Sequence, residues 1–161
     1  MSHLIATFFY IGHIRPAPGT WGSLAALPTA ILLYQLGGPL AVVIAIIVAY
    51  GSGVWATTRE TAGKDNHDPS EIVIDEVVGQ WIALLPVLYG AARNDADVLA
   101  LWPGWVAAFV LFRFFDITKL GPVGWADRRD DATGVMLDDV IAGVLAAVGV
   151  AVLAAVYHLA L

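Results

Sequence analysis

The stretch Glu71-Ile-Val-Ile-Asp-Glu-Val-Val-Gly-Gln-Trp-Ile-Ala-Leu-Leu-Pro86 decides the fold, because it begins with acids and continues as an apolar run. Two adjacent carboxylates, Asp75 and Glu76, open this run. Ionised acids at the entrance of an apolar helix are costly unless a positive group lies beside them. The stretch therefore predicts an apolar helix whose first turn has a cationic partner.

The composition of the whole chain favours a membrane protein. Of its 161 residues, 59% are hydrophobic and 14% are charged, and the mean hydropathy is +0.76. The length indicates a single domain over residues 1–161. A soluble domain of this size has too small an interior to hide so much apolar surface from water. A very apolar soluble helical bundle is the alternative.

Several features exclude or disfavour other classes of protein. The chain has no cysteine, so it has no disulfide, thiolate metal site or cysteine nucleophile. Its formal charge of -6 argues against nucleic acid as a partner, because a phosphate backbone requires clustered lysine and arginine. The scattered histidines disfavour a histidine-based lipid phosphatase. These histidines are His3, His13, His67 and His158.

Apolar segments follow one another along the chain, separated by glycine, proline and charged residues. They are Leu24–Leu36, Pro39–Thr57, Val73–Tyr89, Val98–Phe115 and Val135–Leu161. A membrane-spanning helix needs about 20 apolar residues, a length that the second and fifth segments reach and the fourth approaches. The chain is therefore expected to be all-α, a compact integral membrane bundle of four or five apolar helices.

The charges of the connecting loops predict an orientation. If each segment crosses the membrane once, the N-terminal loop, the 58–72 loop and the 116–134 loop share one face. Arg93 alone falls on the opposite face. The basic residues of the shared face are Arg15, Arg59, Lys64, Arg113, Lys119, Arg128 and Arg129. Basic loops mark the cytoplasmic side, so a polar site is expected at the cytoplasmic surface.

Acidic pairs occur at the start of two apolar runs. Asp75 and Glu76 lie in Ile-Val-Ile-Asp-Glu-Val-Val-Gly, and Asp138 and Asp139 lie in Val-Met-Leu-Asp-Asp-Val-Ile-Ala-Gly. Each pair is followed within about one turn by a glycine, where a neighbouring helix could approach closely. Together with Asp116, these acids would repel one another on one membrane face. Hard oxygen ligands suit Mg²⁺, so we predict a magnesium site, with a structural charge network as the alternative.

Basic and glycine-rich stretches accompany the acids. Arg113 and Asp116 are three residues apart and share a helix face, which is also the spacing of an ordinary ion pair. The turn Arg15-Pro-Ala-Pro-Gly-Thr-Trp-Gly-Ser23 leads into a helix whose free N–H groups would attract an anion. Thr20 and Ser23 are candidate phosphate-binding residues there, and a plain membrane-entry turn is the alternative. A metal ion that is held by carboxylates and lies beside arginine and lysine can bind a phosphoryl group and activate water.

Stretches in four parts of the chain together resemble the phosphatidylglycerophosphatase A family. They are Pro18-Gly-Thr-Trp-Gly-Ser-Leu24, Ile72-Val-Ile-Asp-Glu-Val-Val-Gly-Gln-Trp-Ile82, Phe112-Arg-Phe-Phe-Asp-Ile-Thr-Lys119 and Gly134-Val-Met-Leu-Asp-Asp-Val-Ile-Ala-Gly143. The resemblance covers most of the chain in the expected order. It implies an all-helical fold in the bacterial inner membrane and Mg²⁺-dependent hydrolysis of phosphatidylglycerophosphate to phosphatidylglycerol and phosphate.

The resemblance also implies roles for individual residues. Arg113 and Lys119 become candidate phosphate contacts, and Glu76, Asp116 and Asp139 become candidate catalytic residues. The implied metal ligands are Asp75, Glu76, Asp116, Asp138 and Asp139. Attack on phosphorus by an activated water and attack by Asp116, which would give an aspartyl-phosphate, both stay open.

Two other classes of function are alternatives to hydrolysis of a lipid phosphate. A small transporter or channel would use the carboxylates as an ion site, but it needs ionisable residues deep in its spans, and Leu40–Tyr50 and Val144–Ala155 carry no charge. A structural partner in a lipid-synthesis complex would release no phosphate. The expected partners are a phospholipid substrate and the membrane. The sequence leaves open whether the chain also forms a homo-oligomer.

Overall fold

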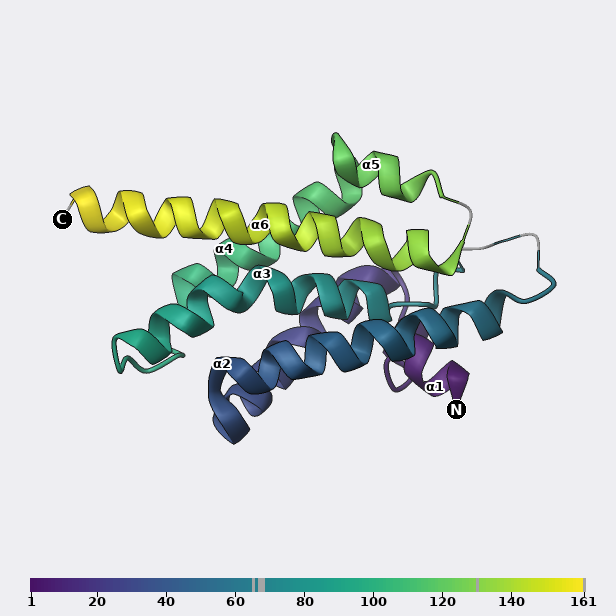
Figure 1. Cartoon of the computed structure of the whole chain (residues 1–161), viewed down its shortest axis with the longest axis horizontal. Coiled ribbons are helices and arrows are strands. Elements are labelled where there is room, and N and C mark those ends of the chain that lie inside the picture. Colours follow the sequence, from purple (N-terminus) through teal and green to yellow (C-terminus); the bar gives the residue numbers. More distant parts are fainter. Residues whose placement is uncertain (65, 67–68, 130, 161) are drawn as a thin grey trace.

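The described part of the protein is built from helices alone. A computed structural model describes residues 1–64, 66, 69–129 and 131–160. Its elements are α1 (Ser2–Ala6), the 3-10 turn η1 (Ile11–His13), α2 (Pro18–Thr61), α3 (Ile74–Arg93), α4 (Trp102–Thr118), α5 (Pro122–Asp127) and α6 (Ala132–Ala160) (Figure 1). The expected all-α class is confirmed, whereas the number of spanning helices stays a prediction.

Helix α2 is a hairpin with two arms. Its helical backbone is interrupted at Gly37 and Gly38, and the φ of 64° and ψ of -159° at Gly38 are accessible only to glycine. Pro39 follows and cannot donate to the preceding turn. Figure 1 shows the arms doubling back beside each other. The break predicted between the segments Leu24–Leu36 and Pro39–Thr57 is therefore found at the two glycines that separate them.

The first arm of α2 begins earlier than the sequence indicated. The apolar pattern begins at Leu24, but the helix already starts at Pro18, with Ala17 as its N-cap residue. Proline is favoured at the first helical position because its fixed φ suits a helix and its missing N–H is not needed there. The glycine-rich stretch expected as a turn thus forms the first turns of α2.

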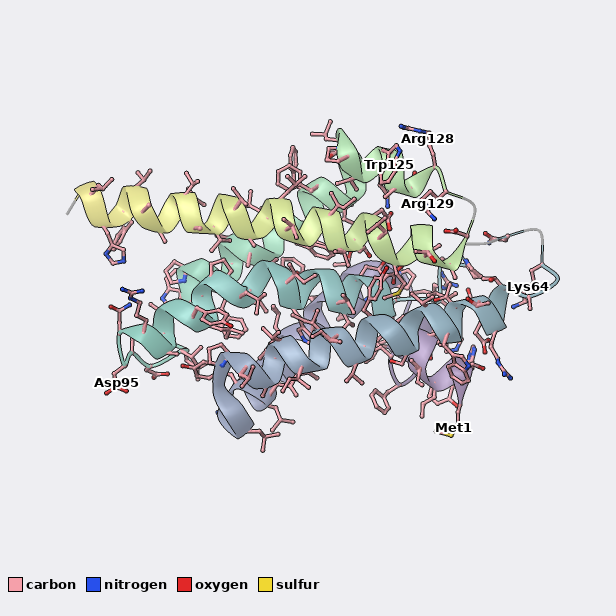
Figure 2. All side chains as sticks on the ribbon, viewed as in Figure 1. Met1, Lys64, Asp95, Trp125, Arg128 and Arg129 are labelled. Carbon is pink, nitrogen blue, oxygen red and sulfur yellow. The ribbon has the colours of Figure 1, made fainter. Side chains whose placement is uncertain are left out.

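The chain ends and loops gather at two opposite ends of the molecule. Figure 1 places the N-terminus, the C-terminal end of α2 and the N-terminal end of α6 at one end. The tip of the α2 hairpin, the loop between α3 and α4 and the C-terminus lie at the other. Figure 2 shows Lys64, Arg128 and Arg129 far from Asp95 accordingly. The described parts of the three loops expected on one face lie at one end of the molecule, whereas their common side of a membrane stays a prediction.

Helix α3 is the centre of the packing. It contacts α2, α4 and α6, and its inward side chains Val77, Val78, Leu84 and Leu88 are fully buried. Phe112 of α4 is buried against it. Asp75 and Glu76 lie in the first turn of this central helix, so the acids of α3 are held within the packed part of the molecule.

The outward faces of the long helices are apolar. Within the described residues, two helices are long and apolar enough to cross a membrane by length and composition, Pro18–Thr61 with a mean hydropathy of 2.3 and Ala132–Leu159 with 2.6. The 28 residues of the second would span about 42 Å as a helix, more than the roughly 30 Å of a bilayer core. Large exposed side chains on α2, α4 and α6 include Leu36, Leu40, Ile44, Ile47, Val106, Val110, Val148 and Val152. This surface favours a membrane location.

Candidate functional site

Two glycines bring the acid-bearing ends of α3 and α6 together. A Cβ on Gly143 would overlap the carbonyl oxygen of Gly79, and a Cβ on Gly79 would lie 2.6 Å from the carbonyl oxygen of Asp139. Neither position has room for a side chain. Gly79 follows the pair Asp75 and Glu76 by about one turn, and Gly143 follows Asp139 by about one turn. The close approach expected at these glycines is confirmed.

Three carboxylates form a cluster where these helices meet, two of them buried and one, Glu76, partly buried. Oxygens of Asp75, Glu76 and Asp139 lie within 4.8 Å of one another. Asp75 and Asp139 are 6% and 2% exposed. Glu76 Oε2 and Asp139 Oδ1 are buried and have no hydrogen-bond partner among the described residues. Unpartnered buried acceptors are costly, so the cluster is suited to a cation.

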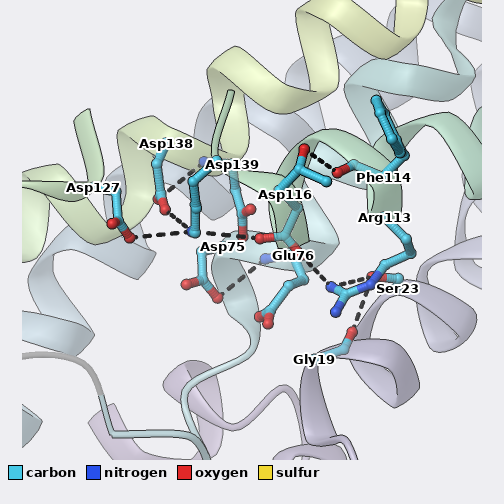
Figure 3. Close-up of polar contacts among 12 residues, drawn as sticks. Gly19, Ser23, Asp75, Glu76, Arg113, Phe114, Asp116, Asp127, Asp138 and Asp139 are labelled. Atoms are coloured by element: carbon cyan, nitrogen blue, oxygen red, sulfur yellow. Dashed lines mark hydrogen bonds and ion pairs between the residues drawn. The ribbon is translucent and has the colours of Figure 1, made fainter. Parts of the chain in front are cut away.

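Lys119 joins three helices through ion pairs at the side of this cluster. Its Nζ contacts Asp138 of α6, and it lies 3.5 Å from Asp116 Oδ1 of α4 and 3.3 Å from Asp127 Oδ1 of α5. Figure 3 shows the three carboxylates gathered at this point. Burial of Lys119 disfavours its charge, but Asp138 and the other nearby acids outweigh burial and raise the pKa of Lys119 above its usual range.

Arg113 links the acids to the first arm of α2. Its Nη1 lies 2.5 Å from Asp116 Oδ2 and donates a hydrogen bond of 3.5 Å to Ser23 Oγ (Figure 3). Arg113 Nε is buried and has no partner among the described residues. A Cβ on Gly19 would overlap Glu76 Oε1, so this glycine lets the start of α2 lie against Glu76. The guanidinium is thus held between α2 and α4 through Nη1, and its Nε donor is unused among the described residues.

The structure therefore sorts the predicted site residues into groups. Asp75, Glu76 and Asp139 form the three-carboxylate cluster, whereas Asp116 and Asp138 are engaged by Arg113 and Lys119. Ser23 contacts the guanidinium. Thr20 is half-buried in the first turn of α2, and its hydroxyl makes no hydrogen bond to these acids within the described ranges. His67 lies outside the described residues.

Two residues near the site had no role assigned from the sequence. Asp127 pairs with Lys119 only because α5 folds back over the end of α4. No local sequence pattern predicts that fold-back. Gln80 lies one turn beyond Glu76 on α3, is fully buried, and has no hydrogen-bond partner for either amide atom among the described residues. A lone amide within the apolar run of α3 is the signal that could have found Gln80.

The donor set fits a divalent cation. Carboxylate oxygens are the ligands that Mg²⁺ prefers, and the buried oxygens of Glu76 and Asp139 have no other use in the described structure. Arg113 and Lys119 lie beside the cluster and bring positive charge to it. Fold and site together define a helical protein with an apolar exterior and a largely buried carboxylate cluster that could hold a metal ion.

Comparison with known proteins identifies the family. The family model described as phosphatidylglycerophosphatase A matches residues 4–154, so the chain belongs to this family. It is 38% identical over 147 residues to phosphatidylglycerophosphatase A of Haemophilus influenzae, covering 91% of this chain and 84% of the relative. The corresponding protein of Escherichia coli K12 is 37% identical over 147 residues, covering 90% and 78%.

A third relative carries a different name. A Bacteroides thetaiotaomicron protein named "Putative phosphatidylinositol-3-phosphatase" is 40% identical over 155 residues, covering 92% of this chain and 91% of the relative. All three names denote phosphatases of a phosphorylated lipid. No solved structure matches the chain.

Proposed function

We propose that the protein is a Mg²⁺-dependent lipid phosphatase that hydrolyses phosphatidylglycerophosphate to phosphatidylglycerol and inorganic phosphate. The observation that carries the proposal is the convergence of Asp75, Glu76 and Asp139, from two helix ends, beside Arg113 and Lys119. Membership of the phosphatidylglycerophosphatase A family supports the choice of substrate.

In this proposal the three-carboxylate cluster holds the metal. Asp75, Glu76 and Asp139 would be its ligands, because their oxygens are close enough to share one ion. A divalent cation bound there would polarise the phosphoryl group and make water a better nucleophile at neutral pH. Asp116 and Asp138, which the sequence grouped with the ligands, would instead fix the two basic side chains.

The basic side chains would bind the phosphate. Arg113 has an unused Nε donor, and the ion pairs of Lys119 keep its amine charged. A phosphate monoester carries up to two negative charges and several acceptor oxygens, so it can take hydrogen bonds from both groups. Ser23, which contacts Arg113, and Thr20 in the same two turns of α2 would line the phosphate site.

Hydrolysis then requires one water and one proton acceptor. The water oxygen would bond to phosphorus, its proton would pass to a carboxylate, and the bond from phosphorus to the glycerol oxygen would break, with that oxygen leaving as an alcohol after protonation. Glu76 and Asp139 each have an unpartnered oxygen suited to accept the proton. Both oxygens of Asp116 are in ion pairs, which favours water over Asp116 as the nucleophile.

The same proposal places the protein in the membrane. The apolar outer faces of α2, α4 and α6 would contact the bilayer, with the acyl chains of the substrate alongside them. Lys64, Arg128 and Arg129 lie at the end of the molecule that carries the acids, so this end would face the cytoplasm of a bacterial inner membrane.

Phosphate release from defined lipids tests the proposal. Purified full-length protein would be assayed on phosphatidylglycerophosphate, phosphatidylinositol 3-phosphate and phosphatidic acid, with Mg²⁺ and with chelator. We expect release from phosphatidylglycerophosphate that requires Mg²⁺ and falls by orders of magnitude in Asp139→Asn. Preference for phosphatidylinositol 3-phosphate would refute the proposed substrate, and activity that Asp139→Asn retains would refute the site.

A further inference from the structure

Two histidines outside the carboxylate site face each other at the surface. Nε2 of His3, in α1, lies 2.9 Å from Nε2 of His13, in η1. The other ring nitrogen of His3, Nδ1, lies 3.0 Å from Glu60 Oε2 near the end of α2. Three separate parts of the chain thus meet through two imidazole rings and a carboxylate, although the histidines looked scattered in the sequence.

The surroundings hold the two rings in place. The Tyr10 ring stacks on His13, with centroids 5.9 Å apart and an angle of 23° between the planes, and it packs at 5.8 Å against His3. Tyr10 has a φ of 68°, a left-handed conformation that is unusual for a tyrosine and turns the chain back so that His13 reaches His3. The side chain of His3 is 42% exposed, so solutes have access to the pair.

From this geometry we propose a second metal site, in which His3 and His13 bind one divalent transition-metal ion such as Zn²⁺ through their Nε2 atoms. Two nitrogens bound tetrahedrally to zinc at 2.0–2.1 Å are about 3.3 Å apart, so the rings need to separate by only a few tenths of an ångström. Glu60 accepts the Nδ1–H of His3, the outer-sphere contact that metal-binding histidines typically make. Water fills the remaining positions of the ion.

The site would differ in metal preference from the carboxylate cluster. Imidazole suits zinc, copper and nickel, whereas carboxylate oxygen suits Mg²⁺. The pair of His3 and His13 would therefore not bind the Mg²⁺ that the carboxylate cluster is proposed to hold. A bound ion would tie α1 and η1 to the end of α2 and so stabilise the folded N-terminal segment. The competing explanation is a plain hydrogen bond between the rings, with Glu60 fixing the tautomer.

Zinc binding by the full-length protein in detergent tests the proposal. The protein would compete with a chromogenic chelator for Zn²⁺. A large excess of Mg²⁺ would occupy the sites that have only oxygen ligands. We expect one zinc per chain and a rise in melting temperature on binding. Glu60→Gln should weaken the affinity by roughly 10–100-fold, the usual effect of losing an outer-sphere partner, and His3→Gln or His13→Gln should weaken it further.

The control is His158→Gln, which alters an exposed histidine at the far end of α6 and should leave zinc affinity unchanged. Melting temperatures without zinc show whether each variant folds. No saturable zinc binding in the wild type, or binding that His13→Gln leaves intact, would overturn the proposal and leave only a hydrogen bond. Because phosphate release is not measured, the result is independent of the phosphatase proposal.

Discussion

The carbonyl oxygen of Gly79 occupies the space in which a side chain of Gly143 would begin, so α3 and α6 touch backbone to backbone one turn from their acids. A pair of larger residues would hold the two helices further apart. Since Asp75 and Glu76 belong to one helix and Asp139 to the other, the separation of these helices sets the distance between the carboxylates.

Substitution of Gly143 by alanine tests this dependence. The added methyl group would overlap the Gly79 carbonyl, and overpacking of this kind costs about 1–3 kcal/mol. We expect Gly143→Ala to lower the melting temperature. It should also raise the Mg²⁺ concentration at which phosphate release is half-maximal. The matched control is Gly90→Ala on α3, where a Cβ meets nothing within 4 Å. Equal behaviour of the two variants would contradict the role given to the glycine contact.

The pair of Arg113 and Asp116 is expected to act as a unit. Their atoms are 2.5 Å apart and both side chains are largely buried, so loss of either leaves the other charge without its partner. Arg113→Gln and Asp116→Asn should each reduce kcat/KM, and the double variant should lose less than the sum, with a coupling of about 0.5–3 kcal/mol. Losses that simply add would show that the two residues work separately.

The raised pKa of Lys119 predicts slow reaction with amine-reactive reagents. Only the uncharged amine reacts, and each unit of raised pKa reduces its fraction tenfold at a given pH below the pKa. We expect Lys119 to be modified more slowly than exposed Lys64 at pH 9, as measured by peptide mass spectrometry. Asp138→Asn removes the main stabilising contact and should speed modification of Lys119. Equal rates in the wild type would refute the raised pKa.

The proposed orientation can be tested by single cysteines, because the chain has none of its own. Lys64 and Arg128 lie at the end with the carboxylates and Asp95 lies at the opposite end, so the variants are Lys64→Cys, Arg128→Cys and Asp95→Cys. An impermeant maleimide should label the first two only from the cytoplasmic side and the third only from outside. Labelling of Lys64→Cys and Arg128→Cys from different sides would contradict the shared face.

Much of the arrangement was predictable from local sequence. Gly37 and Gly38 followed by Pro39 predicted the break within α2. A glycine one turn after each acidic pair predicted the close approach of a neighbouring helix, which the structure shows as the contact of α3 with α6. These features depend on few residues near one another in the chain. They therefore leave a recognisable pattern.

The division of the acids into two groups was not predictable in this way. It depends on Lys119, which ends α4 in a left-handed conformation with a φ of 49°, and on α5, which carries Asp127 back to it. The meeting of His3 with His13 likewise depends on left-handed backbone at Phe8, Phe9 and Tyr10. Such conformations are rare for these residue types, so residue preferences do not foretell them.

A crystal of the protein soaked with Mn²⁺, which shares the oxygen preference of Mg²⁺, tests the central claim most directly. The proposal predicts an anomalous-scattering peak among the carboxylates of Asp75, Glu76 and Asp139 that disappears in Asp139→Asn. A peak elsewhere, or a wild-type crystal in which these three carboxylates bind no ion, would contradict the proposed mechanism.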